Sequence, residues 1–185
     1  MPDVLRPPWD AFLADVDAAF EAPFELHCLG GFVIAQLHDF ERVTVDVDII
    51  EVRGADVRAV AALAGKGSRL HRRHDVYMDV VTVAAVPDRY EERLIDLASG
   101  MFKYLRLRAL EPHDLVLAKL TRNIDRDRED VKRLAARGLL HAHVLRSRYE
   151  SELRDQLGRP EREDLTLDLW IDMIDEVGRE GSNET

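Results

Sequence analysis

Two aspartates separated by one residue lie inside a stretch that otherwise has the composition of a buried strand. They are Asp46 and Asp48, in the segment "RVTVDVDIIEV". Because side chains alternate across a strand, both carboxylates point to one face, and a rise of about 3.3 Å per residue places their Cβ atoms about 6–7 Å apart. Carboxylates this close repel each other unless they face water, share a proton or bind a cation. The pair therefore predicts either a solvated strand face or a site for a divalent metal such as Mg²⁺ or Mn²⁺.

A third carboxylate, Asp79, lies inside another apolar segment, "DVYMDVVTV". If the two strands are neighbours, Asp46, Asp48 and Asp79 can converge on one point. Three convergent carboxylates are typical of two-metal phosphoryl transfer. The alternative is an isolated surface acid. Asp75 also belongs to this segment, but its place at the strand entrance favours a turn residue.

Two glycines, Gly30 and Gly31, follow the predicted strand "FELHCL" and precede the helical pattern "FVIAQLHD". Bare backbone N–H groups at a helix start favour phosphate binding, although any tight turn can also use glycine. The spacing from this turn to the aspartate pair allows one helix, one short loop and a return to the adjacent strand.

The stretch "GGFVIAQLHDFERVTVDVDII" resembles the signature of the nucleotidyltransferase fold of the DNA polymerase β type. The closer likeness is to the stand-alone bacterial subgroup related to the AbiEii-type nucleotidyltransferase toxins. In that subgroup Arg-x-Thr precedes the aspartate pair, as Arg42 and Thr44 do here. A later Lys followed by Asp-x-x-Asp is matched in "DLVLAKLTRNIDRDREDVKRL" by Lys119, Arg122, Asp127 and Asp130.

The resemblance implies an enzyme that transfers NMP from an NTP to a hydroxyl, with Mg²⁺ or Mn²⁺ held by the three aspartates. The implied acceptor is a tRNA end or a protein side chain, and the implied setting is a toxin–antitoxin or phage-defence system with an antitoxin partner. One departure from the commoner pattern is Phe32, which replaces a small hydroxyl residue after the glycines. The implied nucleotide-binding residues are Gly30, Gly31, Arg42, Thr44, Lys119 and Arg122.

The later motif also has a physical interpretation of its own. Lys119 and Arg122 are three residues apart, so a helix would present both on one face, where a point charge and a forked donor suit a triphosphate. The alternative for Lys119 is a surface lysine whose stem covers apolar groups. Asp127 could equally cap a helix, with Asp130 in its first turn.

The pattern of elements predicts an α+β fold, in which a small mixed sheet flanked by helices precedes an all-helical C-terminal part. We expect a nucleotidyltransferase core over residues 1–110, a helical part over 111–178 and a disordered tail over 179–185. Predicted strands include Phe24–Leu29, Arg42–Val52 and Asp75–Val83. Gly65–Ser68, "GKGS", lacks the longer frame of a P-loop and is predicted to be a loop.

The net charge of −10 is uneven, because residues 66–148 carry +6 and each flank carries −8. The basic centre keeps an anionic ligand such as a nucleotide or RNA compatible with an acidic protein. A single cysteine, Cys28, and the lack of a membrane span favour a cytoplasmic protein with a packed core thiol. A competing hypothesis is a catalytically weak module that binds nucleotides or proteins. The apolar positions of "DLTLDLWIDMIDEV", from Leu165 to Val177, would serve a partner only if they are exposed.

Overall fold

The computed structural model of the chain describes residues 5–37, 44–81 and 84–183. The chain forms two units, the first comprising residues 1–83 and 94–110 and the second 84–93 and 111–185. One boundary between them falls between Leu110 and Glu111. Residues 84–93, which we expected in the sheet domain, belong to the second unit.

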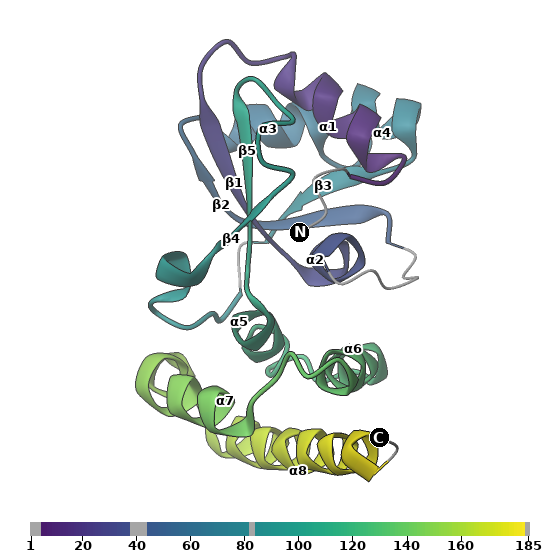
Figure 1. Cartoon of the computed structure of the whole chain (residues 1–185). Helices are drawn as coiled ribbons and strands as arrows, with labels where there is room; N and C mark the ends of the chain where they lie inside the picture. The colour runs from purple at the N-terminus through teal and green to yellow at the C-terminus, as the bar shows by residue number, and fades with distance from the viewer. Residues whose placement is uncertain (1–4, 38–43, 82–83, 184–185) are drawn as a thin grey trace. The chain divides into compact units, whose positions relative to one another are not determined.

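The first unit is built on a five-stranded mixed sheet (Figure 1). Its strand order is β3-β2-β1-β5-β4. β1 is antiparallel to β2 and parallel to β5, β2 is parallel to β3, and β4 is antiparallel to β5. This sheet with its helices confirms the predicted α+β fold. The strands are β1 (Phe24–Leu29), β2 (Asp46–Arg53), β3 (Tyr77–Val80), β4 (Ile95–Leu97) and β5 (Leu105–Ala109).

A β-bulge in β2 keeps the polar residues of that strand on one face. Cys28 pairs with Ile49 but His27 pairs with Glu51, so that Ile50 is an extra residue. Without the bulge, strict alternation would place Glu51 on the opposite face from Asp48. The strand periodicity predicted over residues 42–52 is therefore broken once. We call the resulting surface the polar face; by register it carries Glu25, His27, Asp46, Asp48, Glu51, Arg53, Tyr77, Asp79, Asp96, Arg106 and Arg108.

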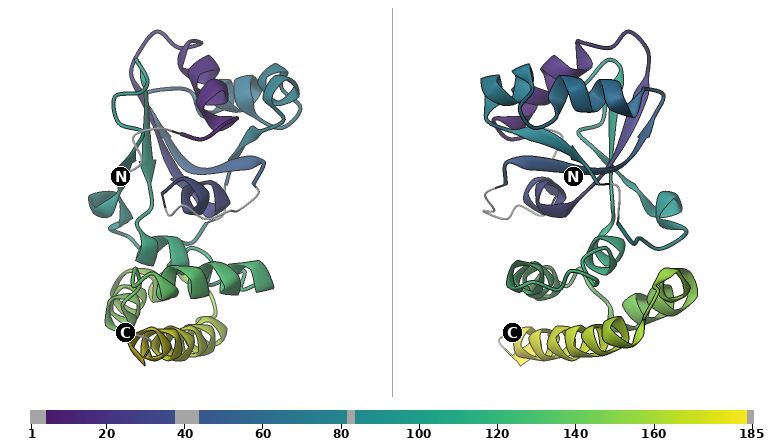
Figure 2. Two further views of the ribbon diagram at one scale, coloured as in Figure 1. Left: turned by 45° about the vertical axis from the view of Figure 1, so that its right-hand side comes forward. Right: turned by 180° about the vertical axis from the view of Figure 1, so that it is seen from behind.

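The opposite face of the sheet is apolar and belongs to the core. Its buried side chains include Leu26, Cys28, Val47, Ile49, Met78 and Leu107. Helix α1 (Trp9–Asp17) joins other helices of this unit: Trp9 meets Phe32 of α2 edge-on at 5.0 Å between ring centroids, and Phe12 meets His74 of α4 at 5.8 Å. Figure 2 shows α1, α3 and α4 close to one another. The other helices of this unit are α2 (Gly30–Leu37), α3 (Val57–Ala64) and α4 (Arg69–His74).

Helix α4 was missed at the level of sequence, because its run "RLHRRH" has almost no apolar periodicity. Ser68 caps it by accepting a hydrogen bond from the His71 N–H at 3.1 Å. It ends at Asp75, which adopts a left-handed conformation with φ of 58° and so is the turn residue expected before β3. The cap, rather than an apolar stripe, defines this short helix.

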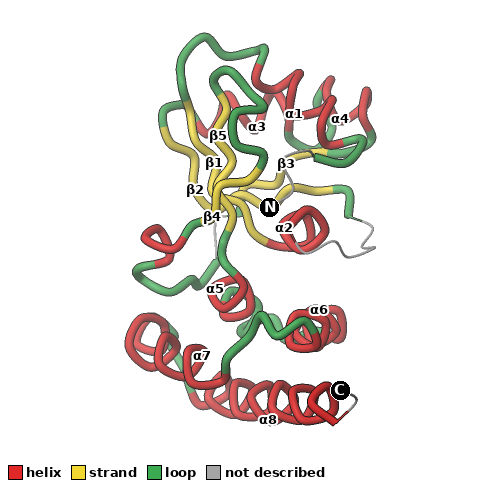
Figure 3. Tube along the Cα trace, in the orientation of Figure 1, coloured by secondary structure: helices red, strands yellow, loops and turns green. Residues whose placement is uncertain are grey.

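The second unit contains helices and no strand in its described residues (Figure 3). Helix α5 stops at Leu117, and α7 is followed directly by a π-helical segment and a 3₁₀ turn. The tail expected to be disordered from residue 179 is helical through Asn183. The elements are η1 (Tyr90–Arg93), α5 (Pro112–Leu117), α6 (Asp125–Ala136), α7 (Ala142–Arg148), η2 (Tyr149–Leu153), η3 (Arg154–Gln156) and α8 (Glu161–Asn183).

Buried ion pairs attach residues 84–93 to this helical unit. Arg93 donates to both oxygens of Asp114, at 2.8 and 3.1 Å, and to both oxygens of Glu152, at 3.2 and 2.8 Å. Both carboxylates are almost fully buried. Burial raises the pKa of Glu152, but the Arg93 and Arg89 hydrogen bonds outweigh it and bring that pKa below its usual range. Breaking these buried ion pairs would leave uncompensated charges in the interior, which would greatly lower the free energy of unfolding.

Helix α8 divides its apolar residues between two sides. Leu167, Trp170 and Ile174 are buried, whereas Leu165 and Leu169 are each 67% exposed. None of the helices in the described residues is long and apolar enough to cross a membrane.

Candidate active site

Gly30 brings the end of β1 directly against Asp48. Leu29 is the antiparallel partner of Asp48, and Gly30 follows it with φ of 76° as α2 begins. A Cβ placed on Gly30 would lie 1.9 Å from Oδ2 of Asp48. Position 30 therefore requires glycine for two reasons: the backbone is left-handed, and the Asp48 carboxylate leaves no space for a Cβ.

The register of β2 and β3 places the second and third aspartates side by side. Asp48 is the parallel partner of Asp79, and Asp46 is the partner of Tyr77. Because partners share a face, all four side chains lie on the polar face. Burial raises the pKa of Tyr77, and Asp46, Asp79 and Asp48 raise it further. All three carboxylates thus act electrostatically on one phenol. We call Asp46, Asp48 and Asp79 the acid row.

The negative charge of Asp48 also affects the thiol of Cys28, which lies on the opposite, buried face of the sheet. Cys28 is fully buried. Burial raises the pKa of Cys28 strongly, and the negative charge of Asp48 adds to that shift. A thiol held protonated in this way is a packing group and not a nucleophile.

The donor set of the acid row suits a hard cation. Carboxylate oxygens are the ligands that Mg²⁺ prefers, and Mg²⁺ usually takes one or two carboxylates and completes its shell with water and substrate phosphates. Among the described residues, no group of three or more His, Cys, Asp or Glu side chains is arranged to hold a metal. The row therefore fits a metal that is shared with a phosphate ligand better than a closed protein cage.

The residues before the pair were also predicted to bind nucleotide. Thr44 donates from Oγ1 to Oδ1 of Asp46 at 2.7 Å, so its hydroxyl positions that carboxylate. Arg42 lies outside the residues that the structure describes. Gly31 is buried in the first turn of α2. Phe32 is fully buried and packs on Trp9, which explains why the chain has an aromatic residue rather than a hydroxyl residue after the glycines.

Comparison with known proteins was made by family model, by curated protein and by solved structure. A family model described as "Nucleotidyltransferase of unknown function (DUF6036)" matches residues 15–177. The chain belongs to this nucleotidyltransferase family. No curated protein and no solved structure matches it. The AbiEii-like subgroup remains a prediction.

A cation that the sequence did not single out lies beside the acid row. Nζ of Lys66 is 5.6 Å from the ring centroid of Tyr77, and His71 meets the same ring edge-on at 5.0 Å. Gly65 forms a parallel bridge to Met78, so the "GKGS" loop runs along β3. The loop is not a P-loop, but its lysine is a phosphate-binding candidate. The signal available in the sequence was a lysine between two glycines in a predicted loop.

Lys119, which was predicted to neutralise a triphosphate, is buried in the second unit. Its side chain is 4% exposed, and Nζ donates to Asp127 at 3.1 Å and to Asp130 at 2.9 Å. Arg122 donates to both oxygens of Asp127, at 2.8 and 2.6 Å. The helix predicted to present both cations on one face ends at Leu117, and the two residues lie in the turns after it.

Asp127 has a capping role as well as these ion pairs. Its Oδ2 accepts the backbone N–H of Ile124, the residue before α6, at 3.3 Å. Burial raises the pKa of Asp127, but Arg122 and Lys119 outweigh it and leave that pKa lowered. The later motif of this family member therefore forms a neutralised cluster in which every described charge has a partner, and we assign it to stability.

Proposed function

We propose that this protein transfers a nucleoside monophosphate group from an NTP to a hydroxyl acceptor, with pyrophosphate as the leaving group. The observation that carries the proposal is the acid row: Asp48 stands opposite Asp79, with Gly30 against it at a helix start. Family membership supports the same class of reaction. In the reaction, the acceptor oxygen bonds to the α-phosphorus, the bond from that phosphorus to the bridging oxygen breaks, and the acceptor hydroxyl gives up its proton.

Asp46, Asp48 and the predicted third ligand Asp79 would hold Mg²⁺ or Mn²⁺ only together with substrate phosphate oxygens, because these three carboxylates, all within the described residues, do not form a metal site alone. A divalent ion bound there neutralises phosphate charge and polarises the phosphoryl oxygens. Thr44 fixes the orientation of Asp46 through its hydroxyl. Asp79 is the exposed member of the row, so a carboxylate oxygen is available there for the proton of the acceptor hydroxyl.

The protein's own phosphate contacts would come from α2 and Lys66. The first N–H groups of a helix lack intrahelical partners, and those of α2 begin at Gly30, beside Asp48. Lys66 supplies a positive charge near Tyr77 on the same side of β3. Lys119 and Arg122 are left out of this role because Asp127 and Asp130 already take up their charge.

For the acceptor, the resemblance suggests a tRNA end or a protein side chain, in a toxin–antitoxin or phage-defence setting. The positive balance of residues 66–148 is compatible with RNA. An antitoxin partner would have to use a surface of the folded protein, and exposed Leu165 and Leu169 are one candidate.

A second candidate function is binding of nucleotides or proteins without transfer. It is favoured by the lack, among the described residues, of three side chains arranged to hold a metal. It is also favoured by Phe32, which provides no hydroxyl for phosphate.

Label transfer separates the two functions. The protein is incubated with each α-labelled NTP, Mg²⁺ or Mn²⁺ and either total RNA or a cell extract, and labelled products are resolved. We expect a labelled product with the wild type and a loss of at least about 100-fold with Asp48→Asn, because an interaction needed in the transition state is removed. Glu51→Gln, on the same strand and face, is the matched control and should retain activity. No product with any nucleotide would support the binding function.

A further inference from the structure

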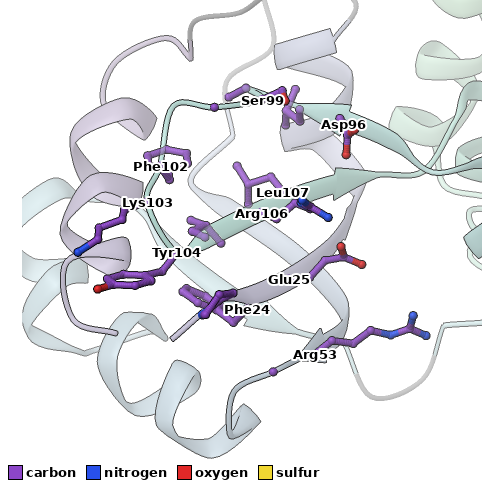
Figure 4. A pocket seen from close by; sticks show the side chains of 16 residues that line it. Phe24, Glu25, Arg53, Asp96, Ser99, Phe102, Lys103, Tyr104, Arg106 and Leu107 are labelled. Carbon is purple, nitrogen blue, oxygen red and sulfur yellow. The ribbon is translucent and has the colours of Figure 1, made fainter. Parts of the chain in front are cut away.

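The sheet unit contains a cavity that shares no residue with the acid row. A cavity of about 580 Å³ lies among the start of β1, the end of β2 and the β4–β5 hairpin (Figure 4). This volume is within the range of about 300–1,000 Å³ that is usual for small-ligand sites. The register places the cavity at the end of the polar face remote from Asp48, because Glu25 pairs with Arg53 whereas Leu29 pairs with Asp48.

One cation in this cavity has no carboxylate partner in the described part of the chain. Arg106 is exposed on β5 and forms no hydrogen bond or ion pair with any described residue. By contrast, Arg108, two residues along the same strand, is held by Asp96 at 3.0 Å. A free guanidinium at a cavity favours an anionic ligand such as a phosphate.

Two carboxylates line the same cavity and are held in fixed positions. Glu25 binds the buried ring of His27 at 2.7 Å, and Asp96 binds Arg108. Both therefore have part of their charge compensated while oxygen atoms remain accessible. A carboxylate of this kind is the usual acceptor for the hydroxyl groups of a ribose.

The loop that closes the cavity carries backbone strain. Ala98 has φ of 53° and Gly100 has φ of 75°, and the Met101 N–H closes the turn on the Ala98 carbonyl at 3.1 Å. Alanine in the left-handed region costs about 1–3 kcal/mol, and residues held in this way concentrate at ligand sites. A Cβ on Gly100 would meet nothing within 4 Å, so the turn is open. Backbone N–H groups in such turns form concavities that bind anions.

Aromatic side chains complete the lining. Phe102 and Tyr104 belong to it, and Figure 4 shows them with Lys103 on the side opposite Glu25, Arg53 and Asp96. Aromatic faces stack on nucleobases at about 1–3 kcal/mol per base. The cavity thus combines a guanidinium, carboxylates and aromatic rings, which are the three kinds of group that a phosphate, a ribose and a base require.

We propose that this cavity is a second nucleotide-binding site, which takes a mononucleotide without metal. Arg106 binds its phosphate, Glu25 and Asp96 accept from its ribose, and the aromatic side chains contact its base. The site is independent of the acid row and of the transfer reaction proposed for it.

The test is calorimetric titration of the full chain with AMP in the presence of EDTA, which removes divalent metal. We expect AMP to bind, and Arg106→Gln to weaken binding about 10- to 100-fold, since it removes a charged hydrogen-bond donor. The matched control is Arg58→Gln, an exposed arginine of α3 outside the cavity. The double variant Asp48→Asn/Asp79→Asn should bind AMP as the wild type does.

Two further measurements test which part of the nucleotide the cavity recognises and where the nucleotide binds. Inorganic phosphate should bind at least tenfold more weakly than AMP, and photo-crosslinking with 8-azido-AMP should label a peptide within residues 94–107. Circular dichroism and thermal melting check that each variant is folded. The proposal is overturned if AMP does not bind in EDTA, if the acid-row variant loses binding while the Arg106 variant keeps it, or if phosphate binds as tightly as AMP. Because no metal is present, none of these outcomes bears on label transfer at the acid row.

Discussion

Replacing Gly30 by alanine tests whether the end of β1 lies against Asp48. The left-handed backbone, with φ of 76°, costs about 1–2 kcal/mol for any residue with a Cβ. The new methyl group would also lie 1.9 Å from Oδ2 and 2.9 Å from Cγ of Asp48, so either the carboxylate or the start of α2 must move. Overpacking of this kind adds about 1–3 kcal/mol. The total loss in the free energy of unfolding is therefore about 2–5 kcal/mol, or about 4–20 °C in melting temperature for a chain of this size.

Gly67→Ala is the matched control, because its φ is 83° and a Cβ there would meet nothing within 4 Å. It should lose only the backbone contribution of about 1–2 kcal/mol. Urea unfolding followed by the fluorescence of Trp9, which packs on Phe32 of α2, reports on this unit. The variants are measured in a Trp170→Phe background, so that Trp9 is the single tryptophan.

A double-mutant cycle isolates the contact itself. Asp48→Ala removes the two atoms nearest to the added methyl and leaves Cβ at 3.2 Å, so Gly30→Ala should be milder in that background by about 1–3 kcal/mol. If Gly30→Ala is no more destabilising than Gly67→Ala, or if the cycle shows no coupling, Gly30 does not lie against Asp48 and the geometry of the site is wrong.

Three further predictions concern charged groups in both units. Lys119→Met leaves two buried aspartates without their shared cation, and should lower the free energy of unfolding by about 3–5 kcal/mol in urea titrations at pH 7; a loss under 1 kcal/mol would contradict the buried cluster. Burial raises the pKa of Glu111, but contacts with His113 and Arg148 outweigh it and bring that pKa to about 2. The ionised Glu111 therefore adds about 3 kcal/mol to the free energy of unfolding above pH 4.5, and this contribution is lost as the pH falls toward 2. Glu111→Gln should flatten that part of the stability–pH curve, and an unchanged curve would refute the assignment. Asp79→Asn should lower the pKa of Tyr77, seen in absorbance titrations at 295 nm against a Tyr77→Phe blank, and no change would place Asp79 away from that phenol.

The strands and the acid row could be predicted because their signals are local. β1 occupies the predicted residues, and the alternation in "TVDVDII" marks the polar and buried sides of β2. The adjacency of β2 and β3 was an assumption at the level of sequence. Once β2 and β3 pair, their register places Asp48 opposite Asp79.

The features that could not be predicted depend on long-range contacts. The environment of Lys119 depends on Asp130, eleven residues away, and its spacing on a helix suggested exposure instead. Residues 84–93 join the helical unit through Arg93, whose partners Asp114 and Glu152 are distant in sequence. The bulge at Ile50 and the Lys66–Tyr77 contact also have no periodic signal, because each is set by a neighbouring strand or loop.

Binding of Mn²⁺ in the presence of a slowly hydrolysed ATP analogue is the most direct measurement of the acid row. Electron paramagnetic resonance counts free and bound Mn²⁺ for the wild type, for Asp48→Asn, for Asp79→Asn and for the control Glu51→Gln. We predict one or two bound ions that need the nucleotide, with affinity at least about tenfold weaker in both aspartate variants and unchanged in the control. Nucleotide-dependent Mn²⁺ binding of equal strength in all four proteins, or none in the wild type, would contradict a metal–nucleotide centre at Asp46, Asp48 and Asp79.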